Sequence, residues 1–255
     1  MSDVNSLSEI RRLGTSHPLA MISDNDFKMA SKLLDVGLDQ DSMNLLLEYH
    51  LVNNDNIKIS ELLLEKGANT NHICKGEVAG AGSLYEIGRR NGDKNFLLNE
   101  PIPMQMIYVA VIHYGLLDRE DRSKGWCNPN FSALPEKMQL LTKFDMNVEI
   151  QDKRGDSLIS LLSKLTKEFP CFKSYNQYEI TNKIIDPITK ATATLIEAGA
   201  TISKKEYESN KKLFHGVVTE IGGRIFSRKL EKGNFGYNTF NKLITMSQIE
   251  PIVRE

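Results

Sequence analysis

A short phrase that recurs along the chain constrains its fold more than any other feature. It consists of two aliphatic residues, two variable residues, a glycine and a small or polar tail, and it occurs at residues 33–39, 63–71 and 195–201. A fourth copy at 140–148 has Phe144 in the place of the glycine. Aliphatic residues followed by such a glycine are typical of a helix that ends at a left-handed residue. The phrase therefore predicts a chain of repeated helices.

Residues 152–162 supply a complementary beginning for such a helical unit. Asp152 and Gly155 predict a turn, and Ser157 predicts a helix N-cap. Four aliphatic residues then open a helix that we expect to pack inward: Leu158, Ile159, Leu161 and Leu162. A turn, a helix and a second helix that ends in glycine together make one repeat unit.

These residues resemble the ankyrin repeat, whose units open D-x-x-G-x-T-P-L-H-x-A and close L-L-x-x-G-A-D-x-N. Residues 67–71 match the close, and residues 152–162 match the opening. Weaker openings stand at 14–19, 83–93 and 103–115. The resemblance implies an all-α solenoid of about five helix–turn–helix units, at 10–40, 41–73, 80–101, 102–150 and 151–202. The alternative is an α-helical bundle of another kind.

The intervals between the later repeat ends exceed the ankyrin period, so we expect inserted loops at residues 116–135 and 163–190. The first insertion holds the only tryptophan, Trp126, together with Phe131. Both are candidate anchors for a partner, because large rings are favoured at the energetic centres of interfaces. The alternative is that Trp126 folds back and shields neighbouring helices. The second insertion either packs on the scaffold or contacts a partner.

Residues 203–255 are predicted to form a helical cap after a repeat domain at 1–202. Ser203 and Glu206 form a capping-box sequence. Apolar residues then recur at helical spacing: Phe214, Val217, Val218, Ile221, Ile225 and Phe226. The opposite face is basic: Lys204, Lys205, Lys211, Lys212, Arg224, Arg228 and Lys229. One apolar face and one charged face suit the end of a solenoid, and contact with an acidic membrane is the alternative.

Composition excludes several classes of function. A formal net charge of −1 argues against general nucleic-acid binding, which needs a cationic excess. Cys74, Cys127 and Cys171 stand far apart, with no CxxC pair, so neither a disulfide framework nor a zinc site is expected. No cofactor motif is present in its required context. The beginning of the sequence lacks the apolar core of a signal peptide, and we expect a cytoplasmic protein.

The function expected from this pattern is a scaffold that binds a protein partner, without a catalytic residue or a metal. Acidic residues of the first units, Asp35, Asp39 and Asp55, are candidates for steering that partner. Interrupted ankyrin units resemble those of bacterial or viral proteins that are secreted into eukaryotic hosts. The resemblance implies a bacterial effector, delivered by type IV secretion into the host cell cytoplasm, with a host protein as its partner. The alternative is a cysteine-dependent hydrolase or transferase that uses Cys127 and His113.

Overall fold

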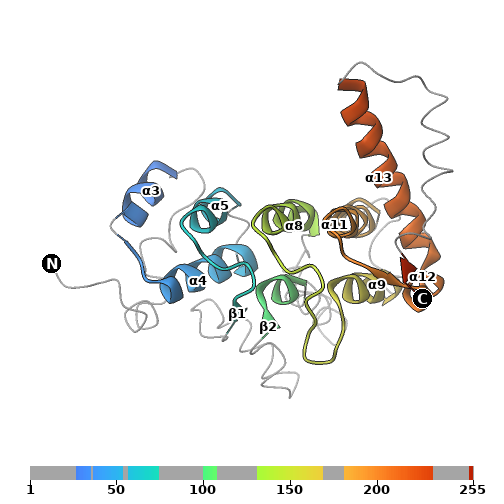
Figure 1. Ribbon diagram of the computed structural model, residues 1–255, viewed down its shortest axis with the longest axis horizontal. Helices are drawn as coiled ribbons and strands as arrows, with labels where there is room; N and C mark the ends of the chain where they lie inside the picture. Colours follow the sequence, from blue (N-terminus) through green and yellow to red (C-terminus); the bar gives the residue numbers. More distant parts are fainter. Residues whose placement is uncertain are drawn as a thin grey trace, which may run out of the picture. The chain divides into compact units, whose positions relative to one another are not determined.

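The computed structural model describes residues 27–35, 37–53, 57–74, 100–107, 131–168, 181–231 and 253–254. Helices account for most of these residues, and the described strands are two residues long, so the predicted all-α class is confirmed (Figure 1). The chain divides into two compact units. The first comprises Met1–Pro129, Lys143–Asn147 and Asp152–Arg154; the second comprises Asn130–Thr142, Val148–Gln151 and Gly155–Glu255.

Before residue 74, the described residues of the first unit form three α-helices and one π-helical turn. They are α3 (Phe27–Asp35), α4 (Gln40–Glu48), η3 (Tyr49–Asn53) and α5 (Ile57–Glu65). Helix α5 packs against α3, α4 and η3. The apolar residues between them are almost fully buried: Ala30, Leu46, Leu47, Leu51, Ile59 and Leu63. Burial of these side chains stabilises the helices, which are each too short to form alone in water.

A two-stranded antiparallel ribbon follows α5 in the first unit. Strand β1 (Ile73–Cys74) pairs with β2 (Glu100–Pro101), with Ile73 opposite Pro101 and Cys74 opposite Glu100. Buried helical residues 102–107 continue from β2. Of the repeat unit predicted at 80–101, only β2 lies within the described residues. The chain thus returns at residue 100 to the strand that it left at residue 74.

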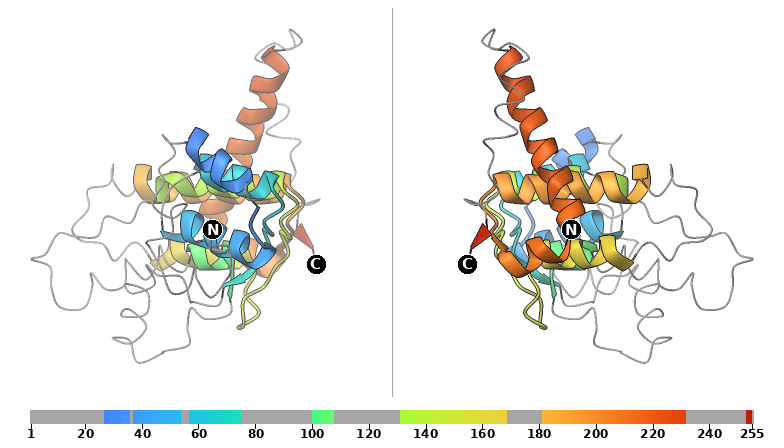
Figure 2. Two further views of the ribbon diagram at one scale, coloured as in Figure 1. Left: turned by 90° about the vertical axis from the view of Figure 1, so that its left-hand side faces the viewer. Right: turned by 90° about the vertical axis from the view of Figure 1, so that its right-hand side faces the viewer.

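The second unit is built from two layers of helices. Its elements are η5 (Phe131–Ala133), α8 (Leu134–Lys143), α9 (Leu158–Glu168), η7 (Thr181–Ile185), α11 (Asp186–Glu197), α12 (Lys204–Ser209) and α13 (Lys211–Glu231). Helices α8 and α11 lie side by side in one layer, and α9 and α12 lie in the other (Figure 1). Helix α13 packs on α11 and then leaves both layers at a steep angle (Figure 2). The last residue of α8, Lys143, belongs to the first unit.

The beginning of α9 follows the prediction from the sequence. Gly155 has a φ of 81°, and the side chain of Asp152 accepts a hydrogen bond from the backbone nitrogen of Arg154 at 2.8 Å. Ser157 Oγ accepts one from the backbone nitrogen of Ser160 at 3.1 Å, which caps the helix. All four aliphatic residues expected to face inward are buried: Leu158, Ile159, Leu161 and Leu162.

Helices α5 and α11 end in the same hydrogen-bonded motif. After α5, Ala68 donates to the carbonyl of Leu63 at 3.0 Å, and Gly67 donates to that of Leu64 at 3.0 Å. After α11, Ala200 and Gly199 make the corresponding bonds at 2.9 and 3.0 Å. Both glycines have a φ of 101°. This is the Schellman arrangement, in which a left-handed residue lets the last carbonyls find donors. The predicted positive φ of Gly67 is confirmed.

Helix α8 ends in a left-handed residue too, but the residue is not the predicted one. Asp145 has a φ of 57°, and Phe144, which was aligned with the glycine, does not. The left-handed residue follows the last helical residue by two positions after α5, α8 and α11. Helix α8 extends to Lys143, so this position falls on Asp145. Aspartate tolerates the conformation because its short polar side chain bonds locally.

Side-chain bonds join the segment after α5 to the segment after α8, and both segments belong to the first unit. The amide nitrogen of Asn147 donates to Asn71 Oδ1 at 2.8 Å, and Asn71 Nδ2 donates to the carbonyl of Asp145 at 3.5 Å. Thr70 Oγ1 donates to the carbonyl of Phe144 at 3.3 Å. Residues 67–71 and 144–147 therefore lie side by side, although more than seventy positions separate the bonded residues in the sequence.

A short strand pair closes the second unit. Strand β3 (Ile202–Ser203) leads into α12 and pairs in parallel with β4 (Val253–Arg254), with Ile202 opposite Val253. An isolated antiparallel bridge joins Gln151 to Ser157 across the turn before α9. Among the helices that the structure describes, none has the length and apolarity needed to cross a membrane.

Candidate functional site

The two aromatic anchors predicted for the first insertion do not form a described surface site. Trp126 lies outside the described residues. Phe131 begins η5 and is only 1% exposed, so its ring fills the core of the second unit. An aromatic side chain this deep stabilises the unit by burial and is not available for contact with a partner. The second insertion is partly helical: α9 continues to Glu168, η7 begins at Thr181, and the residues between them are not described.

The three acidic residues predicted to steer a partner have different surroundings. Asp35 is exposed and forms an ion pair with Lys66 at 2.8 Å. Asp39 is the N-cap of α4 and accepts a hydrogen bond from the backbone nitrogen of Ser42 at 2.7 Å. Asp55 lies outside the described residues. Asp39 thus caps a helix, a role that was not predicted from the sequence.

Cys127 and His113, on which the cysteine-enzyme alternative depends, also lie outside the described residues. Within the described ranges, His72 Nε2 lies 3.9 Å from Glu48 Oε2 in the first unit. The same ranges contain no group of three or more His, Cys, Asp or Glu side chains placed to hold a metal ion.

A buried carboxyl group stands at β2 in the first unit. Glu100 is 3% exposed, and its Oε2 has no hydrogen-bond partner among the described residues. Burial raises the pKa of Glu100 above its ordinary value of 4.5. A backbone hydrogen bond from Lys153 and the positive charge of Lys153 oppose this change in pKa. Glu100 is thus closed off from solvent, which disfavours its ionised form.

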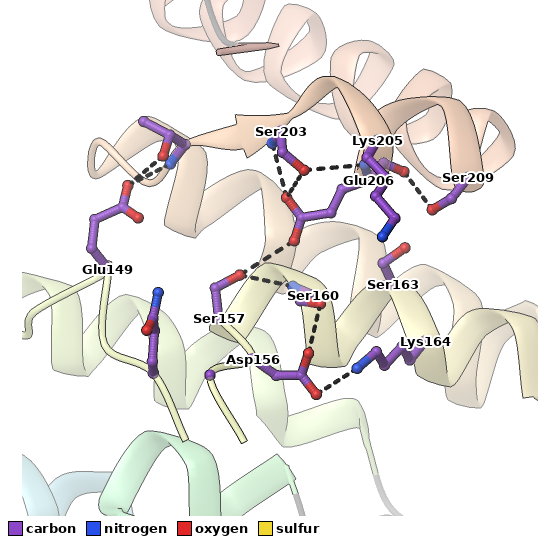
Figure 3. Close-up of a pocket in the computed structure, with 13 residues that line it drawn as sticks. Glu149, Asp156, Ser157, Ser160, Ser163, Lys164, Ser203, Lys205, Glu206 and Ser209 are labelled. Atoms are coloured by element: carbon purple, nitrogen blue, oxygen red, sulfur yellow. Dashed lines mark hydrogen bonds and ion pairs between the residues drawn. The ribbon is translucent and has the colours of Figure 1, made fainter. Parts of the chain in front are cut away.

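A polar groove of about 610 Å³ in the second unit is the best-formed candidate for a binding site (Figure 3). Helices α9 and α12 form its two walls, and residues from the hairpin before α9 close one end. Its lining is dominated by hydroxyl and charged side chains: Glu149, Gln151, Gly155, Asp156, Ser157, Ser160, Ser163, Lys164, Thr201, Ser203, Lys205, Glu206 and Ser209. No histidine, aromatic ring or large aliphatic side chain is among them.

The α12 wall is ordered by a capping box. Glu206 Oε2 accepts hydrogen bonds from the nitrogen and the Oγ of Ser203 at 2.8 and 2.7 Å, and the nitrogen of Glu206 donates to Ser203 Oγ at 3.2 Å. The capping box predicted from the sequence is therefore confirmed. Glu206 Oε1 also accepts a hydrogen bond from Ser157 Oγ at 3.5 Å, which links the two walls (Figure 3).

The α9 wall is ordered by Asp156. Its carboxylate accepts a hydrogen bond from Ser160 Oγ at 3.3 Å and forms an ion pair with Lys164. Ser157, Ser160 and Ser163 follow one another at intervals of three along this helix, which places them on one face. Short side chains on that face leave open space where longer ones would fill it.

Two further contacts set the width of the groove. At the hairpin end, Glu149 Oε1 accepts hydrogen bonds from the nitrogen and the Oγ1 of Thr201 at 2.7 and 2.8 Å. At the far end, Asn210 Nδ2 donates to the carbonyl of Ser163 at 3.0 Å and to Thr166 Oγ1 at 2.6 Å. The walls are thus tied together at both ends, so the groove exists before any ligand binds.

The groove was not predicted from the sequence, although some of its residues were. Ser157, Ser203 and Glu206 were identified as helix caps and not as parts of a site. The one local signal was the run of serines at three-residue spacing in α9. A spacing of this kind indicates a polar helix face, but it does not reveal which second element lies opposite.

Arg224 departs from the basic face predicted for the C-terminal segment. It bonds Glu197 at 2.7 Å, Glu220 at 2.9 Å, Thr194 Oγ1 at 3.1 Å and the carbonyl of Lys190 at 3.2 Å. Burial disfavours the charged guanidinium, but the hydrogen bonds to Glu220 and Glu197 outweigh it and raise the pKa of Arg224. Arg224 thus joins α13 to α11 and is already paired with acidic residues. It also lines a shallow pocket of about 710 Å³.

The groove is assembled from two short segments, residues 149–164 and 201–209, that are separated by more than thirty residues. The repeat ends are shorter still, at four or five residues each. Neither protein-family models, nor curated proteins, nor solved structures give a match to this chain.

Proposed function

We propose that this chain is an ankyrin-type repeat scaffold, a solenoid whose function is to bind a partner protein. The observation that carries the proposal is the side-chain ladder between residues 67–71 and 144–147. Each segment follows a helix that ends in a left-handed residue, and the two segments are bonded laterally, as the ends of stacked repeat units would be. Repeats of this kind expose extended surfaces, which suit a macromolecular partner.

The chemistry of the groove favours binding over catalysis. Its serines have carboxylates as neighbours and no imidazole, so none is paired with a base suited to activate a hydroxyl near neutral pH. Its three carboxylates accept hydrogen bonds from Thr201, Ser160 and Ser203, which hold them in place. Groups fixed in this way form a preorganised surface and lower the entropy cost of association.

We infer that the partner contacts the groove between α9 and α12. The partner that we propose is a protein of the cell in which the chain acts, and delivery into a host cell is the setting that the interrupted repeats suggest. Ser209 and Lys205 line the groove and are exposed.

A pair of photo-crosslinking variants tests this proposal. A photoreactive phenylalanine replaces Ser209 on the groove, or Asn182, which is exposed in the same unit but does not line the groove. We expect cross-linked protein at position 209 and none at 182. The captured partner is then titrated against Ser209→Trp and Asn182→Trp, and only the first should weaken binding, by about tenfold or more. Equal affinity of both variants would place the partner elsewhere.

A further inference from the structure

We propose that Glu48 and His72 form a protonation switch, which controls how firmly residues 67–72 are held on α4. The switch belongs to the first unit and involves none of the residues that line the groove. It therefore operates whether or not the groove binds a partner.

One face of α4 holds the segment that follows α5. Gln40, Asn44 and Glu48 stand four residues apart along the helix, which places them on the same face. Gln40 Nε2 donates a hydrogen bond to the carbonyl of Gly67 at 2.8 Å, and Asn44 Oδ1 accepts one from the backbone nitrogen of Asn69 at 2.8 Å. We call the three side chains the polar row of α4. Its first two members hold the segment through neutral groups, whose bonds do not depend on pH.

The third contact of the polar row differs, because both of its groups can change charge. Glu48 Oε2 lies 3.9 Å from His72 Nε2, just beyond hydrogen-bond distance. The two side chains are 4% and 12% exposed, so their charges are only weakly screened by solvent and salt. A protonated imidazole supplies a counter-charge to the buried carboxylate, and a neutral imidazole withdraws it. The contact is therefore stronger when His72 carries a proton.

The direction of the pH response follows from these charges. The attraction needs a charged imidazole and an ionised carboxylate, and the two groups ordinarily titrate near about pH 6.5 and about pH 4.3. The contact should be strongest between these values and should weaken as the pH rises through the range in which His72 loses its proton. The segment is thus held more firmly in mildly acidic than in alkaline solution.

Residues 67–72 connect the switch to other contacts of the first unit. The carbonyl of His72 accepts a hydrogen bond from the backbone nitrogen of Ile102 at 3.1 Å. One residue earlier, Asn71 Oδ1 accepts the bond from the backbone nitrogen of Asn147 at 2.8 Å. Loosening of the segment should therefore open both amides to exchange with solvent, and so weaken the lateral bonds between the segments after α5 and α8.

Other titratable groups surround the pair on the described elements. Helix α4 packs against α5 and η3, and the segment leads into the β1–β2 ribbon. His50 on η3 is fully buried, and the ribbon adds Cys74 and Glu100, which lie opposite each other. Burial of Glu100 favours its protonated form, so its ionisation also destabilises the unit as pH rises and has to be separated from the switch. The remaining groups are exposed or only partly buried: Asp41, Tyr49, Lys58, Glu61, Glu65 and Lys66.

Amide hydrogen exchange of the full chain, followed by NMR, tests the switch. The protection factors of the Ile102 and Asn147 amides should fall by about fivefold or more between about pH 5.5 and about pH 7.5, in step with the titration of the His72 imidazole in the same samples. The Thr201 amide, which bonds Glu149 in the second unit, should keep its protection within about twofold. A His72 imidazole that titrates without a change in protection, or that does not titrate between about pH 4 and 8, would overturn the inference.

Matched variants assign the effect to the pair. His72→Gln and Glu48→Gln should each reduce the change in protection to less than about twofold. His215→Gln alters an exposed histidine of the second unit and should keep the full change, and Glu100→Gln should keep it as well. If Glu48→Gln does not fold, His72→Gln and the titration of the wild type still decide the question. Loss of the change in Glu100→Gln, or a change that follows the titration of His50 instead of His72, would reject the switch.

Discussion

The two units end their helices in the same way but place polar side chains differently around those ends. In the first unit Asn71 bonds the segment that follows α8, and Glu100 is buried with an oxygen that has no hydrogen-bond partner among the described residues. In the second unit Glu149 and Glu206 make the comparable bonds at the edge of an open groove. The same way of ending a helix thus occurs in two settings. Polar side chains beside the helix end form a closed contact in the first unit and the edge of an accessible groove in the second.

The difference has a consequence for stability. A buried carboxyl group such as Glu100 loses hydration without full replacement, which costs free energy when it is ionised. A carboxylate at the edge of a groove keeps contact with water while it accepts hydrogen bonds. The first unit should therefore respond to pH through its buried carboxyl group.

Truncation of the leucine that begins each Schellman motif should produce the largest effect. Leu63 is 1% exposed and Leu195 is 0% exposed, and the carbonyl of each accepts a hydrogen bond of the motif. Leu63→Ala and Leu195→Ala should each lower the free energy of unfolding by about 2–5 kcal/mol, since each leaves a cavity. Urea unfolding measures the loss. If only one of the two variants loses less than about 1 kcal/mol, the helix in that unit is loosely packed and the two helix ends are not equivalent.

Substitutions at the left-handed residues Gly67 and Asp145 should have the next largest effect on the free energy of unfolding, and the two effects should differ in sign. Gly67→Val forces a β-branched residue to a φ of 101° and should cost about 1–2 kcal/mol or more. Space is not the cause, because nothing lies within 4 Å of the added Cβ. Asp145→Gly should be neutral or stabilising, since glycine adopts a φ of 57° without strain. Loss of stability in Asp145→Gly alone would assign the carboxylate a structural role.

Removal of the lateral bonds should have a smaller effect. Asn71→Ala deletes the bonds to the nitrogen of Asn147 and the carbonyl of Asp145, and Glu149→Ala deletes both bonds to Thr201. Each change should cost about 1 kcal/mol, because net hydrogen-bond contributions are modest. Amide hydrogen exchange at residues 147 and 201 reports the local opening. Unchanged exchange in Asn71→Ala would weaken the ladder as support for stacked repeats.

Glu100 should affect how the free energy of unfolding varies with pH rather than how large that free energy is. Because the pKa of Glu100 is higher in the folded state, the free energy of unfolding should fall as pH rises from about 4.5 through that folded pKa. Glu100→Gln removes this ionisation, so the variant should become more stable relative to the wild type as pH rises. Unfolding in urea at several pH values between 4 and 8 measures both slopes. Parallel slopes would show that ionised Glu100 is accommodated without cost.

Local signals account for the features that the sequence predicted correctly. Gly67 and Gly199 mark helix ends, Ser157 marks a helix start, and Ser203 with Glu206 forms a capping box. Each depends on residues within five positions of one another, because a helix end needs partners only for its own last amides and carbonyls. For the same reason, Asp145 was missed by one residue: the left-handed position follows the length of α8, and a phrase of leucines does not fix that length.

Features that depend on distant residues were not predictable in this way. Phe131 belongs to an expected surface loop in the sequence, yet tertiary packing buries it. Arg224 lies on a face that reads as free and basic, yet Glu197 from another helix neutralises it. The groove requires α9 and α12 to lie opposite each other, and the serines of neither helix indicate the other.

By itself, the sequence determined the helical class, the helix ends and several caps, because left-handed glycines and hydroxyl caps act over one turn of backbone. Only the tertiary structure decided which polar groups are buried, paired or open to a ligand. Burial and pairing depend on the elements that pack around a side chain, and these come from anywhere in the chain. Lys164 and Lys205 are ordinary surface lysines in the sequence, and they share a groove only because α9 and α12 pack side by side.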